Sequence, residues 1–102
     1  MTMRARIVLT LLLLVGIVPG TYAGSVFKGK DLYNAHCSVC HGANGRPVMP
    51  GAPHFERSQG LVLPDPVLFS RISDGKRAMP GYRGVLRHEE IMDVIAYLRT
   101  LH

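Results

Sequence analysis

The sequence predicts an all-α domain, because its apolar residues recur at helical spacing and no segment alternates apolar and polar residues as a strand would. Helices are expected over residues 27–39, over a short segment that begins at Asp65-Pro66, and over residues 89–101. The 102 residues, of which 47% are hydrophobic and 19% charged, allow one ordered domain and exclude a large enzyme with a separate substrate domain. The charges are scattered without a basic stripe, which argues against a nucleic-acid partner.

Residues 1–23 have the parts of a cleavable secretory leader. Two arginines form a basic start, an apolar run fills residues 7–18, and small residues precede an expected cleavage after Ala23. A retained membrane anchor is the alternative, but a spanning helix needs about 20 apolar residues and this run is shorter. We therefore expect an exported bacterial protein, with a mature domain of residues 24–102, a periplasmic location and no stable membrane insertion.

The mature domain is mildly basic, with 10 Lys and Arg against 7 Asp and Glu. A chain of this size buries only about 60% of its unfolded surface, so it needs a stabilising group in addition to its own core. Its two cysteines, Cys37 and Cys40, are too close in sequence for a disulfide to close a useful loop. Some other group is expected to stabilise the fold.

The predicted elements each have a local signal. Gly29 lies inside the first helix, where glycine costs about 1 kcal/mol relative to alanine, and it suggests close approach by another element. A long loop rich in glycine and proline fills residues 42–64. Asp65 is expected to cap the second helix, with Pro66 in its first position and Gly75 as its left-handed end.

The last helix is predicted from an apolar stripe that recurs every three or four residues between Ile91 and Leu101. Acidic residues occupy its first turns, where the helix dipole favours negative charge. The loop before this helix, residues 76–84, contains Met79 followed by Pro80.

The chemistry is concentrated in the segment from Cys37 to His41, which reads C-x-x-C-H, the attachment signature of haem c. Two thiols one helical turn apart can form thioethers with one porphyrin, and the adjacent His41 then lies under the iron as a ligand. A thioredoxin-like redox pair would need a βαβ context, and a zinc site would need two more ligands at paired spacing. A structural disulfide would not explain His41.

The second axial ligand must come from the opposite face of the porphyrin. Met79 is favoured, because it follows a wrapping loop and a short helix and is held by Pro80. The other candidates are Met49, Met92 and the histidines 36, 54, 88 and 102. Met49 follows His41 too closely to travel round the porphyrin edge, and Met92 is expected to fill the core. Of the histidines, His54 ranks second after Met79, because its loop lines the haem.

At these residues the mature region resembles the class I c-type cytochromes over nearly its whole length. The matching segments are Gly29-x-x-x-Tyr33, Cys37-x-x-Cys40-His41-Gly42, Gly51-Ala52-Pro53-x-Phe55, Met79-Pro80 and residues 89–98. The resemblance implies a class I cytochrome c fold, in which three to four short helices wrap around one covalently attached haem c.

The same resemblance implies a role for each site residue. Cys37 and Cys40 would carry the haem, and His41 and Met79 would be the axial iron ligands. The Pro53 carbonyl, with Pro50 in reserve, would accept a hydrogen bond from the proximal imidazole.

The resemblance also implies contacts within the fold. Gly29 and Tyr33 would pack on Tyr97 where the first and last helices cross. One departure is that Arg87-His88 stands where the family commonly has Ser or Thr with Asp, which predicts a weak cap on the last helix.

The function implied is one-electron transport, since no acid, base and nucleophile gather around the motif and no catalytic residue is expected. The loops resemble those of small monohaem cytochromes that accompany denitrification (the cytochrome c55X type), which implies a monomer that donates to the cytochrome cd-type nitrite reductase. The alternative is a haem enzyme, or an accessory protein of haem maturation or gas binding, with a labile sixth ligand. Arg46, Lys76, Arg77 and Arg83 predict a basic rim that docks on an acidic patch of the redox partner.

Overall fold

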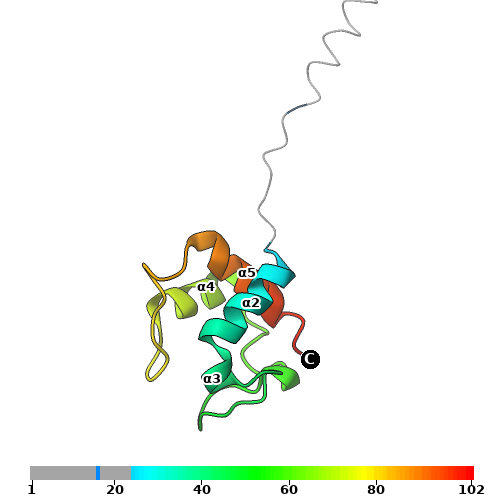
Figure 1. The fold of residues 1–102 in the computed structure, drawn as a ribbon, viewed down its shortest axis with the longest axis vertical. Coiled ribbons are helices and arrows are strands. Elements are labelled where there is room, and N and C mark those ends of the chain that lie inside the picture. Colours follow the sequence, from blue (N-terminus) through cyan, green and yellow to red (C-terminus); the bar gives the residue numbers. More distant parts are fainter. Residues whose placement is uncertain (1–15, 17–23) are drawn as a thin grey trace, which may run out of the picture.

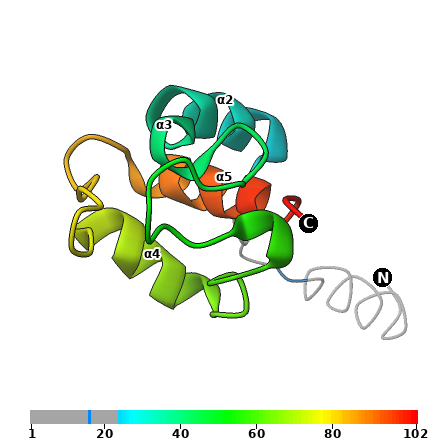
Figure 2. The same cartoon turned by 90° about the horizontal axis from the view of Figure 1, so that it is seen from below.

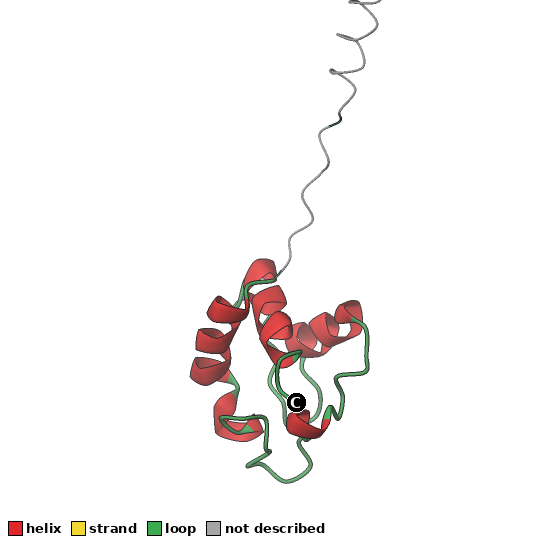
Figure 3. Ribbon diagram, turned by 90° about the vertical axis from the view of Figure 1, so that its right-hand side faces the viewer, coloured by secondary structure: helices red, strands yellow, loops and turns green. Residues whose placement is uncertain are grey.

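The computed structural model describes Gly16 and residues 24–102, so the predicted leader otherwise lies outside the described residues. The described elements, in chain order, are the helices α2 (Val26–His36) and α3 (Ser38–His41), the 3-10 helix η1 (Phe55–Arg57), and the helices α4 (Asp65–Asp74) and α5 (His88–Leu98) (Figure 1). No strand occurs in this part of the chain, where loops connect the helices (Figure 3). The predicted all-α class is confirmed.

Helix α5 is the centre of the fold, because both α2 and α4 pack against it (Figure 2). Its apolar stripe supplies three of the four most deeply buried large side chains, Ile91, Val94 and Ile95, each with 1% of its surface exposed. Burying such side chains contributes about 1.5–3 kcal/mol each. None of the helices in the described part is long and apolar enough to cross a membrane.

The crossing of α2 and α5 depends on Gly29. A β-carbon at this position would stand 1.9 Å from the Asp93 carbonyl oxygen and 3.0 Å from the β-carbon of Tyr97. One turn further on, the Tyr33 ring meets the Tyr97 ring edge to face, with centroids 5.2 Å apart. The expected packing of Gly29 and Tyr33 on Tyr97 is therefore confirmed.

The first predicted helix is two helices. Helix α2 ends at His36. The Cys37 N–H still bonds to the Tyr33 carbonyl, but the φ of Cys37, −116°, departs from the usual helical value of about −63°. The Cys37 carbonyl then accepts from the amides of Cys40 and His41, which starts the new turn α3. Residues 27–39 were expected to be continuous, and the break at Cys37 corrects that expectation.

Helix α4 begins one residue earlier than predicted. Pro64 is the cap, and Asp65 is the first helical residue, with its carboxylate turned to Arg99 instead of to the helix amides. Asp65 was expected to be the cap, so its role is corrected. Gly75 ends the helix with a positive φ of +77°, which glycine adopts readily, but its ψ of 173° lies outside the left-handed helical region that was expected.

Helix α5 ends at Leu98, three residues before the predicted end, because the chain turns there and the Thr100 amide bonds back to the Tyr97 carbonyl. The predicted weakness of its start is partly offset. The Glu90 carboxylate accepts the backbone N–H of Arg87 at 3.0 Å, which is one half of a capping box.

Candidate functional site

A cavity of about 870 Å³ opens between the helices on one side of α5. Its wall is formed by the end of α2, by α3, by the loop that precedes η1, by the inner face of α4, and by the turn that contains Met79. Val94 and Leu98 of α5 close it at the back. This volume lies within the range of about 300–1,000 Å³ that is typical of ligand sites.

The two cysteines lie where α2 is followed by α3. Cys37 lies at the junction and Cys40 one turn later, and both side chains line the wall. Burial, together with the nearby Cys40, raises the pKa of the Cys37 thiol to about 11. The Tyr33 hydroxyl donates to the Gly42 carbonyl at 2.6 Å, which fixes the end of α3 against α2.

His41 faces the cavity with its imidazole stacked on Phe55, the ring centroids being 4.7 Å apart and the planes inclined by 20°. Burial lowers the pKa of His41, which favours the neutral imidazole that binds a metal ion. Its Nδ1 is buried and has no hydrogen-bond partner among the described residues. The bond expected from His41 to the Pro53 carbonyl is thus not formed in this structure, although Pro53 lines the same cavity.

Met79 is held at the cavity by a tight turn. Lys76 and Met79 exchange both backbone hydrogen bonds at 3.0 Å, with Arg77 at the tip in the left-handed conformation (φ +54°). The chain is then anchored to the end of α4, because the Tyr82 amide donates to the Ile72 carbonyl at 2.9 Å. Met79 is half-buried against the core and lines the cavity.

The other candidate ligands are divided by their positions. Met49 also lines the cavity, and its amide donates to the Cys40 carbonyl at 3.0 Å. Met92 packs against the core and does not reach the cavity wall, as expected. His54, the second candidate for the axial ligand after Met79, does not line the cavity, whereas His36 does.

Three cations line the cavity, namely Arg71, Lys76 and Arg77, and no carboxylate of the described residues does so. Arg71 was not foreseen. Its spacing from Leu68 and Ile72 on α4, which also line the cavity, is the signal that could have found it.

The predicted basic rim is smaller than expected. Arg46 pairs with Glu56 at 2.6 Å and Arg83 pairs with Asp74 at 2.5 Å, and neither arginine lines the cavity. Their acidic partners neutralise much of their charge at the surface. Of the four expected residues, Lys76 and Arg77 are therefore the two that line the cavity, and they have no ion pair with any described residue.

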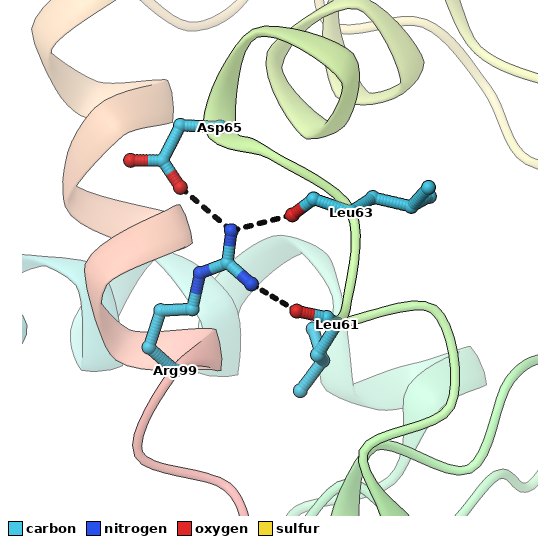
Figure 4. A network of polar contacts seen from close by, with 4 residues as sticks. All are labelled: Leu61, Leu63, Asp65 and Arg99. Atoms are coloured by element: carbon cyan, nitrogen blue, oxygen red, sulfur yellow. Dashed lines mark hydrogen bonds and ion pairs between the residues drawn. The ribbon is translucent and has the colours of Figure 1, made fainter.

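Arg99 is a second residue that the sequence did not single out, and it fixes the loop between η1 and α4 (Figure 4). Its guanidinium donates to the carbonyls of Leu61 and Leu63 and to the Asp65 carboxylate, the last two at 2.7 Å. This loop carries Gln59, which lines the cavity. The guanidinium thus joins the end of α5 to one wall of the site.

The cavity fits a haem c on the chemistry of its donors. It combines two thiols one turn apart, an imidazole with an unpartnered ring nitrogen, a thioether from a distant segment and an otherwise largely apolar lining. In contrast, no group of three or more His, Cys, Asp or Glu within residues 24–102 is arranged to hold a metal ion directly.

Comparisons with known proteins agree with this chemistry. A family model described as "Cytochrome C oxidase, cbb3-type, subunit III" matches residues 24–98. Cytochrome c6 of Thermosynechococcus vestitus is 30% identical over 89 residues, which cover 84% of this chain and 79% of the relative. Cytochrome c6 of a Nostoc strain is 30% identical over 84 residues, which cover 78% and 73%.

Two solved structures share the fold. The KustC0563 c-type cytochrome has a TM-score of 0.66 at 26% identity, over 72% of this chain and 95% of that one. Cytochrome c6 from the diatom Phaeodactylum tricornutum has a TM-score of 0.63 at 30% identity, over 76% and 93%. The chain therefore belongs to the class I c-type cytochromes, the electron carriers that hold one covalently bound haem c, and within them to the family of the cbb3-type oxidase subunit III model.

Proposed function

We propose that the protein is a one-electron carrier whose haem c is attached through Cys37 and Cys40 and ligated by His41 and Met79. The observation that carries this proposal is that these four side chains, from segments far apart in the sequence, line one cavity. The bound group supplies an iron that takes up and releases one electron. The chain holds that iron in place, keeps water from it with apolar side chains, and sets its affinity for an electron.

The roles of the individual residues follow from their surroundings. Phe55, stacked on His41, orients the imidazole, and the Pro53 carbonyl is proposed to accept a hydrogen bond from the ring N–H once the haem is in place. The turn between Lys76 and Met79 presents the thioether. A thioether ligand raises the reduction potential, because it favours ferrous over ferric iron.

Replacing the two cavity methionines one at a time tests the axial ligand. Met79→Ala should keep the covalent haem, lower the potential and abolish the long-wavelength absorption band of thioether-ligated ferric haem. The control is Met49→Ala, which removes the other sulfur of the cavity and should change neither property much. If the two variants exchange these effects, Met49 is the ligand.

The same measurements separate the carrier from a protein with a labile sixth position. Ferrous wild-type protein should not bind carbon monoxide at neutral pH, because both axial positions are filled, whereas Met79→Ala should bind it. Rapid binding to the wild-type protein would favour gas binding or a haem enzyme.

We further propose that the carrier works as a monomer in the periplasm and donates to a denitrification reductase such as the cytochrome cd-type nitrite reductase. The secretory leader and the loops around residues 60–65 and 75–82 support this, and the relatives named cytochrome c6 support the general role alone. In the test, reduced protein is mixed with purified cd-type nitrite reductase, and its reoxidation is followed with and without nitrite. A rate no faster than that of a haem-bearing Lys76→Glu/Arg77→Glu variant would contradict this partner.

A further inference from the structure

The first two described residues of the domain pack against α5. A β-carbon at Gly24 would stand 2.2 Å from the Met92 carbonyl oxygen and 3.0 Å from the β-carbon of Ala96. Such a contact with backbone cannot be relieved by a side-chain movement. Only glycine therefore fits at position 24 with the chain in this place.

Ser25 connects this contact to a buried carboxylate. Its backbone N–H donates to Oδ1 of Asp93 at 2.7 Å, and its hydroxyl accepts from the Lys28 amide as the cap of α2. Asp93 lies in the middle of α5 with 3% of its surface exposed. The backbone nitrogen of Gly24 is one residue away from that of Ser25, so covalent geometry keeps it within about 6 Å of the same carboxylate oxygen.

We infer that removal of the leader directly before Gly24 creates an ion pair that locks α2 onto α5. Hydrolysis of the Ala23–Gly24 peptide bond by a signal peptidase consumes one water and leaves a carboxylate on Ala23 and an amine on Gly24. That amine is largely protonated at neutral pH, whereas the amide nitrogen of the precursor carries no charge. The new ammonium adds to the contacts that Asp93 already makes.

The pairing has a physical basis in burial. A carboxylate that is withdrawn from water is stabilised by a nearby opposite charge more than an exposed one would be. Gly24 is the residue whose amine can approach α5, because any side chain there would be excluded by the Met92 carbonyl. The place of cleavage and the stability of the mature domain are thus coupled, independently of the haem ligands and of the redox partner.

The test compares holoproteins with different N-termini, each verified by mass spectrometry. One chain begins at Gly24, a second at Ala23 and a third at Tyr22, and each is made with Asp93 and with Asp93→Asn. We expect the naturally processed protein to begin at Gly24. The chain that begins there should have a thermal midpoint about 4–8 °C above the other two, and Asp93→Asn should remove most of that difference.

A matched control is Glu89→Gln, which removes an exposed carboxylate from the same helix and should leave the difference intact. If the Asp93→Asn chains do not fold, the N-terminal series decides alone, because one added alanine must already lower the midpoint. Equal midpoints for the chains that begin at Gly24 and Ala23 would overturn the inference. So would a natural N-terminus at another residue, or a difference that persists in full without the Asp93 carboxylate.

Discussion

Gly29 of α2 lies against the backbone of Asp93 in α5, where an added β-carbon would be 1.9 Å from the carbonyl oxygen. Gly29→Ala should therefore push the two helices apart, although alanine is the better helix former by about 1 kcal/mol. We expect a net loss of about 2 kcal/mol in the free energy of unfolding, since overpacking a rigid contact costs about 1–3 kcal/mol and the clash here is with backbone. Denaturant titration of the holoprotein measures it.

The neighbouring substitution Lys30→Ala is the control for Gly29→Ala. Lys30 is exposed on the same helix, so its replacement should change stability by less than about 0.5 kcal/mol. A Gly29→Ala protein as stable as the wild type would mean that α2 and α5 can separate without cost.

Tyr33 should make the stability depend on pH in the alkaline range. Burial raises its pKa to about 12, from an ordinary value of about 10. The unfolded chain therefore loses this proton first, and its contribution to stability is complete below about pH 10 and declines as the pH rises toward about 12. Urea unfolding of the holoprotein, followed from about pH 8 to about pH 12 so that both pKa values are covered, measures the decline.

Tyr33→Phe is the variant that isolates this effect. It removes the hydroxyl that donates to Gly42 and should lower stability by about 1–2 kcal/mol at neutral pH. The difference in the free energy of unfolding between the wild type and Tyr33→Phe should then narrow above about pH 10, the ordinary pKa of tyrosine. A constant gap across the alkaline range would show that Tyr33 ionises equally in the folded and unfolded chain.

Arg99 should control the order of the loop between η1 and α4. Its side chain is 35% exposed, so the loss of its three hydrogen bonds in Arg99→Ala should cost about 1–2 kcal/mol after allowance for solvent. Arg99→Lys should recover only part of this, because an ammonium lacks the planar fork that reaches two carbonyls at once. The readout is the rate of proteolytic cleavage within residues 58–64.

Asp65→Asn separates the ion pair from the carbonyl bonds of Arg99. It removes only the charge of the 2.7 Å pair and should cost less than about 1 kcal/mol, with little change in cleavage. If Asp65→Asn were cleaved faster than Arg99→Ala, the bonds from the guanidinium to the two carbonyls would not be what orders the loop.

Helical periodicity was sufficient to predict the fold class. Gly29 alone indicated close approach by another element, and the resemblance to class I c-type cytochromes identified that element as the last helix. The sequence was less sufficient at helix ends. The first helix is interrupted at Cys37, where φ is −116°, and Asp65 pairs with Arg99, 34 residues away, instead of capping α4. Long-range partners of this kind leave no trace in local sequence.

The same reasoning explains the site. The spacing from Cys37 to His41 and the position of Met79 could be read from the chain, and all these side chains line one cavity. The ion pair between Arg46 and Glu56 depends on how a glycine-rich loop folds back. The sequence alone therefore could not predict which arginines of the basic rim are paired with a carboxylate. The position of Arg71, in contrast, could have been predicted, because its helical spacing from Leu68 places both residues on the face of α4 that lines the cavity.

The last prediction concerns the two cations that frame the cavity without an acidic partner. Lys76 and Arg77 should steer the protein toward an acidic patch on its redox partner, by an attraction that is screened beyond about 10 Å in 0.1 M salt. We expect the bimolecular rate with cd-type nitrite reductase to fall roughly threefold or more as salt is raised through this range. Lys76→Gln/Arg77→Gln should flatten that dependence without moving the reduction potential much.

Lys28→Gln/Lys30→Gln is the matched control, because it changes the net charge equally on a helix face that does not line the cavity, and it should leave most of the salt dependence in place. If both pairs flatten it alike, net charge alone governs the encounter, and a wild-type rate that rises with salt would mean that the two cations oppose docking.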